Sequence, residues 1–187
     1  VRTLFPRLAT FLKAQASLSL VPSVTLDNEV FNHPQVTEVY ELTARHLQPY
    51  YYHHGSITGL ALLQLPDAQV LLKNLRAHGW RTFSLSLHGG PAGHDALVRR
   101  PGAFAALSRA AQVIKDAGCE LVLSLIVGKP LIEERELVSQ FLEQTPHDSV
   151  YAALVNHAPI QRLMDYLPYR AAMPDLTLSV GYSYERG

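Results

Sequence analysis

Two stretches, Thr82-Phe-Ser-Leu-Ser-Leu-His-Gly-Gly90 and Glu120-Leu-Val-Leu-Ser-Leu-Ile-Val127, decide the fold of this 187-residue chain. The first alternates and then stops at a glycine pair, which is typical of a strand followed by a turn. The second is almost continuously apolar, which is typical of a strand buried on both faces. Residues 101–117 lie between them, have helical periodicity and are followed by Gly118, a plausible helix C-cap. The order strand–helix–strand predicts a parallel βαβ unit.

The same alternation of helix and strand extends outward in both directions. Further helices are predicted over residues 3–17, 34–47, 65–78 and 131–144, with a weaker one reaching from 159 to 167. Further strands are predicted over 23–26, 50–53, 150–156 and 176–180. The sequence therefore predicts an α/β fold in a single domain, residues 1–187, with parallel strands and outer helices. Periodicity alone does not separate an open doubly wound sheet from a TIM-like barrel.

Composition narrows the class of protein. Hydrophobic residues make up 48% of the chain and charged residues 17%, which indicates a globular domain. The formal net charge is zero, which disfavours nucleic acid as a partner. The single cysteine, Cys119, excludes an intrachain disulfide and any multi-cysteine metal site, and favours a cytoplasmic location. No apolar run reaches the roughly 18 residues of a membrane span.

Polar residues follow the predicted strands where each strand ends. They are Asp27, Asn28 and Glu29; His53, His54, Gly55 and Ser56; Ser86 and His88; Ser124, Gly128 and Lys129; and Asn156 and His157. Because active sites of parallel α/β folds lie at the carboxyl ends of the strands, these residues are expected on one edge. Any one of them alone is equally well explained as an ordinary polar loop residue. Ser124, inside an apolar strand, and Glu29, beside Val30 and Phe31, favour a site.

Several motif-based sites are disfavoured by the residues present. His53 and His54 are neighbours in a predicted strand and point to opposite faces, so they do not easily chelate one ion. No spacing typical of a metal site occurs, and no metal ligands are predicted in this chain. Cys119 follows Gly118 at the start of a buried strand and is interpreted as an inert, buried thiol. The glycine pair at 89–90 is by itself too weak to predict a phosphate loop.

One run of residues resembles a signature of radical S-adenosylmethionine (radical SAM) proteins. It comprises Phe83-Ser-Leu-Ser-Leu-His-Gly89, then His94-Asp95, then Arg100-Pro-Gly-Ala-Phe104, and the helix and strand after it continue the match to Lys129. Upstream, Leu26-Asp-Asn-Glu-Val-Phe-Asn-His-Pro34 resembles the family loop Gly-Gly-Glu-Pro-Leu-X-His-Pro, which binds the amino group of S-adenosylmethionine (SAM). Asp27 and Asn28 replace the two glycines of that loop, and Val30 replaces its proline. The resemblance covers roughly residues 3–157 and implies a partial (β/α) barrel.

The resemblance also implies cofactors and roles. The family binds SAM and a [4Fe–4S] cluster, and uses them for radical modification of peptides or small molecules. The family's Cys-x-x-x-Cys-x-x-Cys should precede the first helix, where this chain has only Val1 and Arg2. The implied SAM-binding residues are Asn28, Glu29, Ser86 and Ser124, and the implied substrate-side residues are His53, His88, Lys129 and Asn156. The favoured interpretation is a fragment of a longer enzyme that lacks the first strand and the cluster loop, and that is inactive alone.

Two other hypotheses remain open at this point. The chain could be a natural cluster-free barrel that serves as a binding or regulatory module, as the absent cysteines suggest. An in-frame Cys-x-x-x-Cys-x-x-Cys encoded just upstream of Val1 would favour the enzyme, and a start codon at Val1 would favour the module. The third hypothesis is an unrelated TIM-barrel enzyme that uses His and Glu as acid and base. The sequence identifies neither the substrate nor the oligomeric state.

Overall fold

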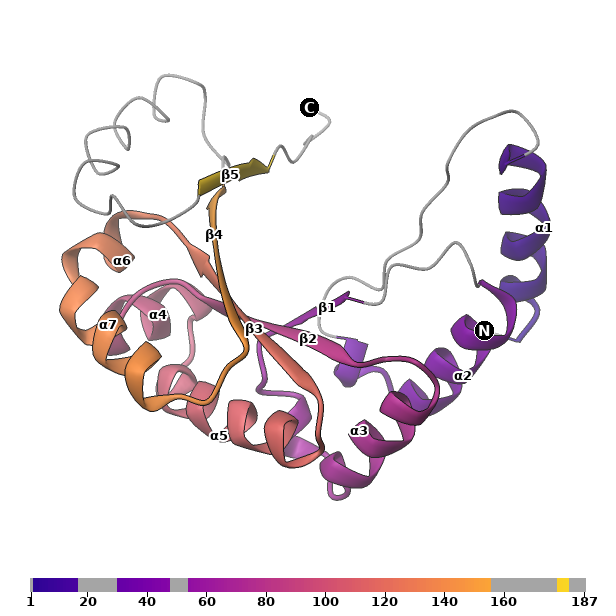
Figure 1. Cartoon of the computed structure of the whole chain (residues 1–187), viewed down its shortest axis with the longest axis horizontal. Coiled ribbons are helices and arrows are strands. Elements are labelled where there is room, and N and C mark those ends of the chain that lie inside the picture. Colours follow the sequence, from indigo (N-terminus) through magenta and orange to yellow (C-terminus); the bar gives the residue numbers. More distant parts are fainter. Residues whose placement is uncertain (1, 17–29, 48–53, 156–177, 182–187) are drawn as a thin grey trace.

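The computed structural model describes residues 2–16, 30–47, 54–155 and 178–181, and its elements alternate along the chain (Figure 1). The helices are α1 Leu4–Ala16, α2 Val36–His46, α3 Ala68–Ala77, α4 Pro91–Val98, α5 Ala103–Asp116, α6 Lys129–Glu133 and α7 Arg135–Gln144. Two short 3-10 helices, η1 Val30–Asn32 and η2 Leu62–Gln64, lie among them. The strands are β1 His54–Ile57, β2 Thr82–Leu87, β3 Glu120–Ile126, β4 Ser149–Val155 and β5 Leu178–Gly181.

The strands form one five-stranded sheet in the order β1-β2-β3-β4-β5, and each pair is parallel. This order runs in one direction, without the reversal that marks a doubly wound sheet. The sheet therefore agrees with the predicted α/β class and its parallel strands. Closure into a barrel is not seen among the described residues.

The helices α3 to α7 lie along one side of the sheet (Figure 1). Burial along the strands follows that arrangement: Leu121, Leu123 and Leu125 of β3 are buried, whereas Val122, Ser124 and Ile126 are only half-buried. Since successive strand residues point to opposite faces, the leucines face the helices and Ser124 faces the other side. We call that other side, which none of the helices α3 to α7 covers, the helix-free face.

An aromatic cluster ties the N-terminal part of the described chain to the sheet. Tyr40 of α2 meets Trp80 edge-on, with ring centroids 4.4 Å apart. Phe31 lies 6.0 Å from Tyr40 and 6.1 Å from Phe83 of β2, measured between centroids. All four rings are at most 2% exposed, and pairs in this geometry add stability beyond the area that they bury. The cluster fixes α2 and η1 against β2.

The helix and strand predictions need three corrections. Residues 54–56, predicted as a polar loop, belong to β1, because His54 and Ser56 pair with Thr82 and Ser84 of β2. The predicted helix at 131–144 is two helices, α6 and α7, which meet at Glu134. Helix α4 was not predicted, because its eight residues include a proline, a glycine and an aspartate and have little helical periodicity. The predicted strand 23–26, the run 50–53 and the helix 159–167 lie outside the described residues.

Among the described residues, no helix has both the length and the apolar character that a membrane crossing requires.

Candidate functional site

The strands β1, β2 and β3 end side by side, because they are parallel and adjacent. We call the residues at and just after these ends the carboxyl edge: Ser86 to Gly90, and Ser124 to Lys129. His88 follows the last residue of β2 and is half-buried. Lys129 begins α6 and is exposed, with its Nζ 3.6 Å from the Glu133 carboxylate. An exposed pair of this kind contributes little to stability. Lys129 is therefore available for other contacts.

A row of polar side chains crosses the helix-free face near this edge. Ser86 of β2 is paired in register with Ser124 of β3, and Ser124 with Tyr151 of β4. Register partners on adjacent strands point to the same face, so the two hydroxyls and the phenol ring are neighbours. Both serines are half-buried, and Tyr151 is 43% exposed. Hydroxyl groups on a partly sheltered face can hydrogen-bond a polar ligand.

A second group lies where β2 passes into α4. The Nδ1 atom of His94 accepts a hydrogen bond from the backbone N–H of His88, at 3.3 Å. The two imidazole rings are 5.6 Å apart, and His94 also meets Phe104 edge-on at 6.2 Å. His94 is 2% exposed, and burial, helped by the nearby His88, lowers its pKa to about 4. Burial also lowers the pKa of His88. Both rings are therefore neutral at neutral pH.

Asp95 connects the same loop to the next helix. Its carboxylate accepts the backbone N–H of Phe104 at 2.7 Å and that of Gly102 at 2.5 Å. These two donors lower the pKa of Asp95 below its usual value. Both N–H groups stand at the start of α5, where backbone donors have no acceptor within the helix, so Asp95 caps that helix from outside it.

Replacing Asp95 by alanine should lower the free energy of unfolding, because the backbone N–H groups of Gly102 and Phe104 would lose their acceptor at the start of α5. Asp67 offers a matched control, since it stands at the N-cap of α3 without a side-chain cap hydrogen bond. Urea unfolding of both variants measures the difference. Equal losses for Asp95→Ala and Asp67→Ala would contradict the capping role.

The N-terminus of α4 is occupied by a carboxylate from the neighbouring loop. Glu134 accepts the backbone N–H of Gly93 at 2.8 Å. A Cβ at Gly90 or Gly93 would lie within 3 Å of Glu134 atoms, so the glycines permit this close contact. Since a protein carboxylate already occupies this helix end, the geometry disfavours a phosphate loop at Gly89-Gly90.

Of the predicted site residues, the structure brings Ser86 and Ser124 together and places His88 and Lys129 at the same edge. The predicted residues Asn28, Glu29, His53 and Asn156 lie outside the described residues. Sequence reasoning assigned no role to His94, Tyr151 or Glu134. For His94 the available signal was the His-Asp pair of the motif run, whereas the contact of Glu134 spans 41 residues and has no local signal.

The residues present do not fit an iron–sulfur cluster. Cys119 is the one cysteine of the chain, and burial raises the pKa of its thiol. It is 2% exposed and directly precedes β3, at the opposite end of the strand from the carboxyl edge. A cluster needs several thiolates, which a single buried thiol cannot supply. Within the described ranges, no three His, Cys, Asp or Glu side chains are grouped as metal ligands would be.

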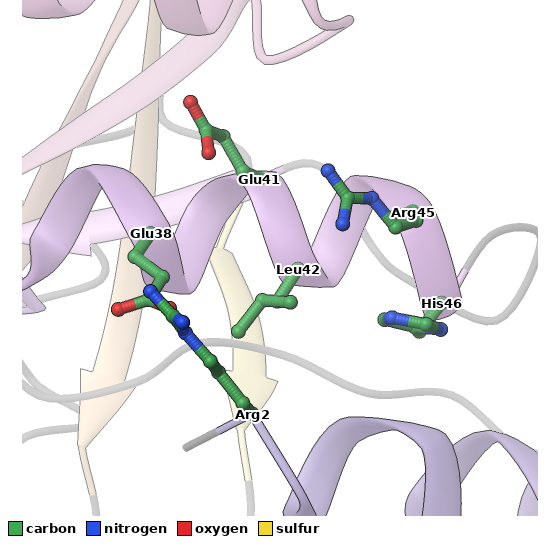
Figure 2. Close-up of a pocket in the computed structure, with 6 residues that line it drawn as sticks. All are labelled: Arg2, Glu38, Glu41, Leu42, Arg45 and His46. Atoms are coloured by element: carbon green, nitrogen blue, oxygen red, sulfur yellow. The ribbon is translucent and has the colours of Figure 1, made fainter.

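A surface pocket of about 390 Å³ lies elsewhere, between the start of α1 and the outer side of α2 (Figure 2). Its lining residues are Arg2, Glu38, Glu41, Leu42, Arg45 and His46. The Arg2 guanidinium, which Figure 2 shows reaching across the pocket, forms an ion pair with Glu38. The lining is charged and open, and none of it comes from the carboxyl edge. We therefore place the candidate site at the edge and not in this pocket.

Comparison with known proteins finds solved structures with a similar fold. No family model matches the chain, and no curated protein matches it. The fold is similar to that of SuiB from Streptococcus suis. The crystal structure of SuiB matches with a TM-score of 0.53 and 13% sequence identity, over 87% of this chain and 39% of SuiB. SuiB bound to S-adenosylmethionine matches with a TM-score of 0.53 and 14% identity.

A third structure, SuiB bound to the precursor peptide SuiA, matches with a TM-score of 0.56 and 12% identity. At these identities the likeness concerns the fold alone, and it supports the expected radical SAM-like fold. The chain spans about two fifths of the length of the SuiB structures that it matches.

Proposed function

We propose that this chain is part of the core of a radical SAM-type enzyme, in which the carboxyl edge and the helix-free face bind SAM. The observation that carries the proposal is the row of Ser86 and Ser124 in a fold similar to that of SuiB. Their hydroxyls would contact the methionine carboxylate or the ribose of SAM. Glu29 would hold its ammonium group, a charge-assisted contact, and Asn28 would also contact SAM.

The substrate proposed for the whole enzyme is a peptide or a small molecule. One structure of SuiB, to which this fold is similar, contains a precursor peptide, which supports the peptide class. His53, His88, Lys129 and Asn156 would line the substrate side of the edge. The exposed ammonium group of Lys129 and the neutral imidazole of His88 offer donors and an acceptor to a peptide backbone.

The [4Fe–4S] cluster of such an enzyme would need cysteines outside these 187 residues, since Cys119 does not fit that role. When bound, the cluster would supply the electron that cleaves SAM. The residues of this chain would bind and orient SAM and exclude water from it. Anaerobic iron and sulfide reconstitution of the chain alone should give no cluster absorption. A longer protein that joins this chain to a Cys-x-x-x-Cys-x-x-Cys segment should give it and should cleave SAM.

SAM binding can be tested on the chain by NMR titration. We expect the amide shifts to concentrate at residues 86–90 and 124–129. The double variant Ser86→Ala, Ser124→Ala should bind SAM roughly 10–30-fold more weakly, because each lost hydrogen bond contributes about 1 kcal/mol. Ser139→Ala, an exposed serine on α7, is the matched control and should bind like the wild type. A folded wild-type chain that shows no shifts with SAM contradicts the proposal.

The alternative is a cluster-free barrel that acts as a binding or regulatory module. The observation that favours it is the single, buried cysteine. The two functions differ in one measurement: a module has no SAM cleavage in any protein that contains this chain. Cleavage by the longer protein, lost when its cluster cysteines are replaced, excludes the module.

A further inference from the structure

The segment from His88 to Asp95, which runs from the end of β2 into α4, is held at three successive residues of α4 by three different parts of the molecule. Glu134, between α6 and α7, accepts the N–H of Gly93. His94 accepts the N–H of His88, where β2 ends. Asp95 accepts N–H groups at the start of α5. The flanking contacts at Gly93 and Asp95 therefore hold α4 in place, and His94 with it.

The hydrogen bond of His94 defines its chemical state. Because Nδ1 accepts a hydrogen bond from a backbone N–H, the neutral ring carries its own proton on Nε2. Burial at 2% exposure and the His88 ring beside it favour this neutral form. A protonated His94 would present a second N–H to the His88 N–H, and the bond would be lost. Among the described residues, two charged groups near His94 are Asp95, next to it in the chain, and Glu134, which contacts the preceding residue.

We propose that His94 is a positioning residue for the end of β2, Ser86 to His88, and thereby for ligand binding at the carboxyl edge. This inference rests on the proposed function. His94 itself touches no ligand in this scheme: it acts from the outer helical layer, through the backbone of His88. Ser86, near the end of β2, and His88, just after it, are the groups whose places it sets.

A purely space-filling role for His94 makes a different prediction, because its ring also packs against Phe104. Two variants separate the roles. His94→Phe keeps an aromatic ring and removes the acceptor. His94→Asn loses the ring, but its side-chain oxygen can occupy the place of Nδ1 and accept the same hydrogen bond. His78→Phe is the control, since His78 is exposed at the end of α3, before β2 begins.

The experiment is NMR on the full chain with SAM as the probe. We expect the wild-type His94 ring to show a protonated Nε2 and an unprotonated Nδ1. His94→Phe should shift the His88 amide and weaken SAM binding about fivefold, the effect of one hydrogen bond. His94→Asn should bind within about twofold of the wild type, as should His78→Phe.

The inference is overturned if the His94 ring carries its proton on Nδ1, or if His94→Phe leaves the His88 amide unchanged. It is equally overturned if His94→Asn binds worse than His94→Phe, since the ring would then matter and not the acceptor. A wild-type chain that fails to bind SAM contradicts the proposed function but not the positioning role of His94. The His94 tautomer and the His88 amide still decide the positioning role in that case. If His94→Phe does not fold, the wild-type tautomer and His94→Asn decide it.

Discussion

Replacing Gly93 by alanine should destabilise the protein by about 2 kcal/mol, although alanine favours helix more than glycine does. A Cβ at this position would lie 2.5 Å from Cβ of Pro130 and 2.6 Å from Oε2 of Glu134. The glutamate can turn away, but only by giving up its hydrogen bond to the Gly93 N–H. The proline ring is rigid, so α4 and α6 must separate. Overpacking of this kind costs about 1–3 kcal/mol and outweighs a helix gain of about 1 kcal/mol.

Gly128→Ala is the matched control for this prediction. Gly128 stands at the N-cap of α6, and a Cβ there would meet only Cδ of Pro130, at an ordinary 3.8 Å. Its backbone is extended, with a φ of −148°, which alanine adopts without strain. We expect Gly128→Ala to lower the free energy of unfolding by less than about 1 kcal/mol, the cost of a poorer N-cap residue without any steric clash. Urea unfolding monitored by circular dichroism measures both variants. A Gly93→Ala protein as stable as the control would show that α4 and α6 are not packed as described.

Acidification from about pH 6.5 to about pH 4 should remove roughly 3 kcal/mol of stability through His94 alone. The pKa of His94 is about 4 in the folded chain and 6.5 in its usual state. At pH values between these two, the His94 ring is protonated in the unfolded chain and mostly neutral in the folded chain. The contribution is therefore complete above about pH 6.5 and declines as the pH falls to about 4, where the dependence ends. Burial lowers the pKa of His88 too, so that residue adds a loss of the same sign.

His94→Asn isolates the part of this loss that belongs to His94. It keeps an acceptor for the His88 N–H but does not titrate, so its stability should fall far less over the same window. Asp95 acts in the opposite part of the range: its depressed pKa gives stability that is lost only as the pH falls below about 4. Urea midpoints taken in steps of about one pH unit test the prediction. Parallel curves for the wild type and His94→Asn would show that His94 is not buried in its neutral form.

Most strands of the sheet could be predicted from the sequence, whereas the residues between them were predicted less well. Strand β3 was predicted over 120–127 and observed over Glu120–Ile126, because a nearly continuous apolar run is typical of a strand. Its predicted burial on both faces holds for one face among the described residues, since Val122, Ser124 and Ile126 are half-buried. The strand predicted to begin at Thr82 and to stop before the glycine pair is observed over Thr82–Leu87. In contrast, residues 54–56 were predicted as a loop because they are polar. In the structure they form part of β1, because they pair with β2 and not because of their own strand propensity.

The candidate site, too, could be predicted only in part from the sequence. That Ser86, His88, Ser124 and Lys129 share one edge followed from the sequence, because parallel strands place their carboxyl ends together. That Ser86 and Ser124 are register partners, with Tyr151 as the next in the row, required the pairing of three strands.

By itself, then, the sequence determined the parallel α/β class, the buried strands and the edge where polar groups gather. These follow from hydrophobic periodicity and chain order, which are local properties. Only the tertiary structure decided that His94 faces the end of β2 and that Glu134 covers the start of α4. Each of these depends on contacts between residues distant in the chain or on different elements. The free energy of such contacts comes from packing and desolvation, which no local pattern records.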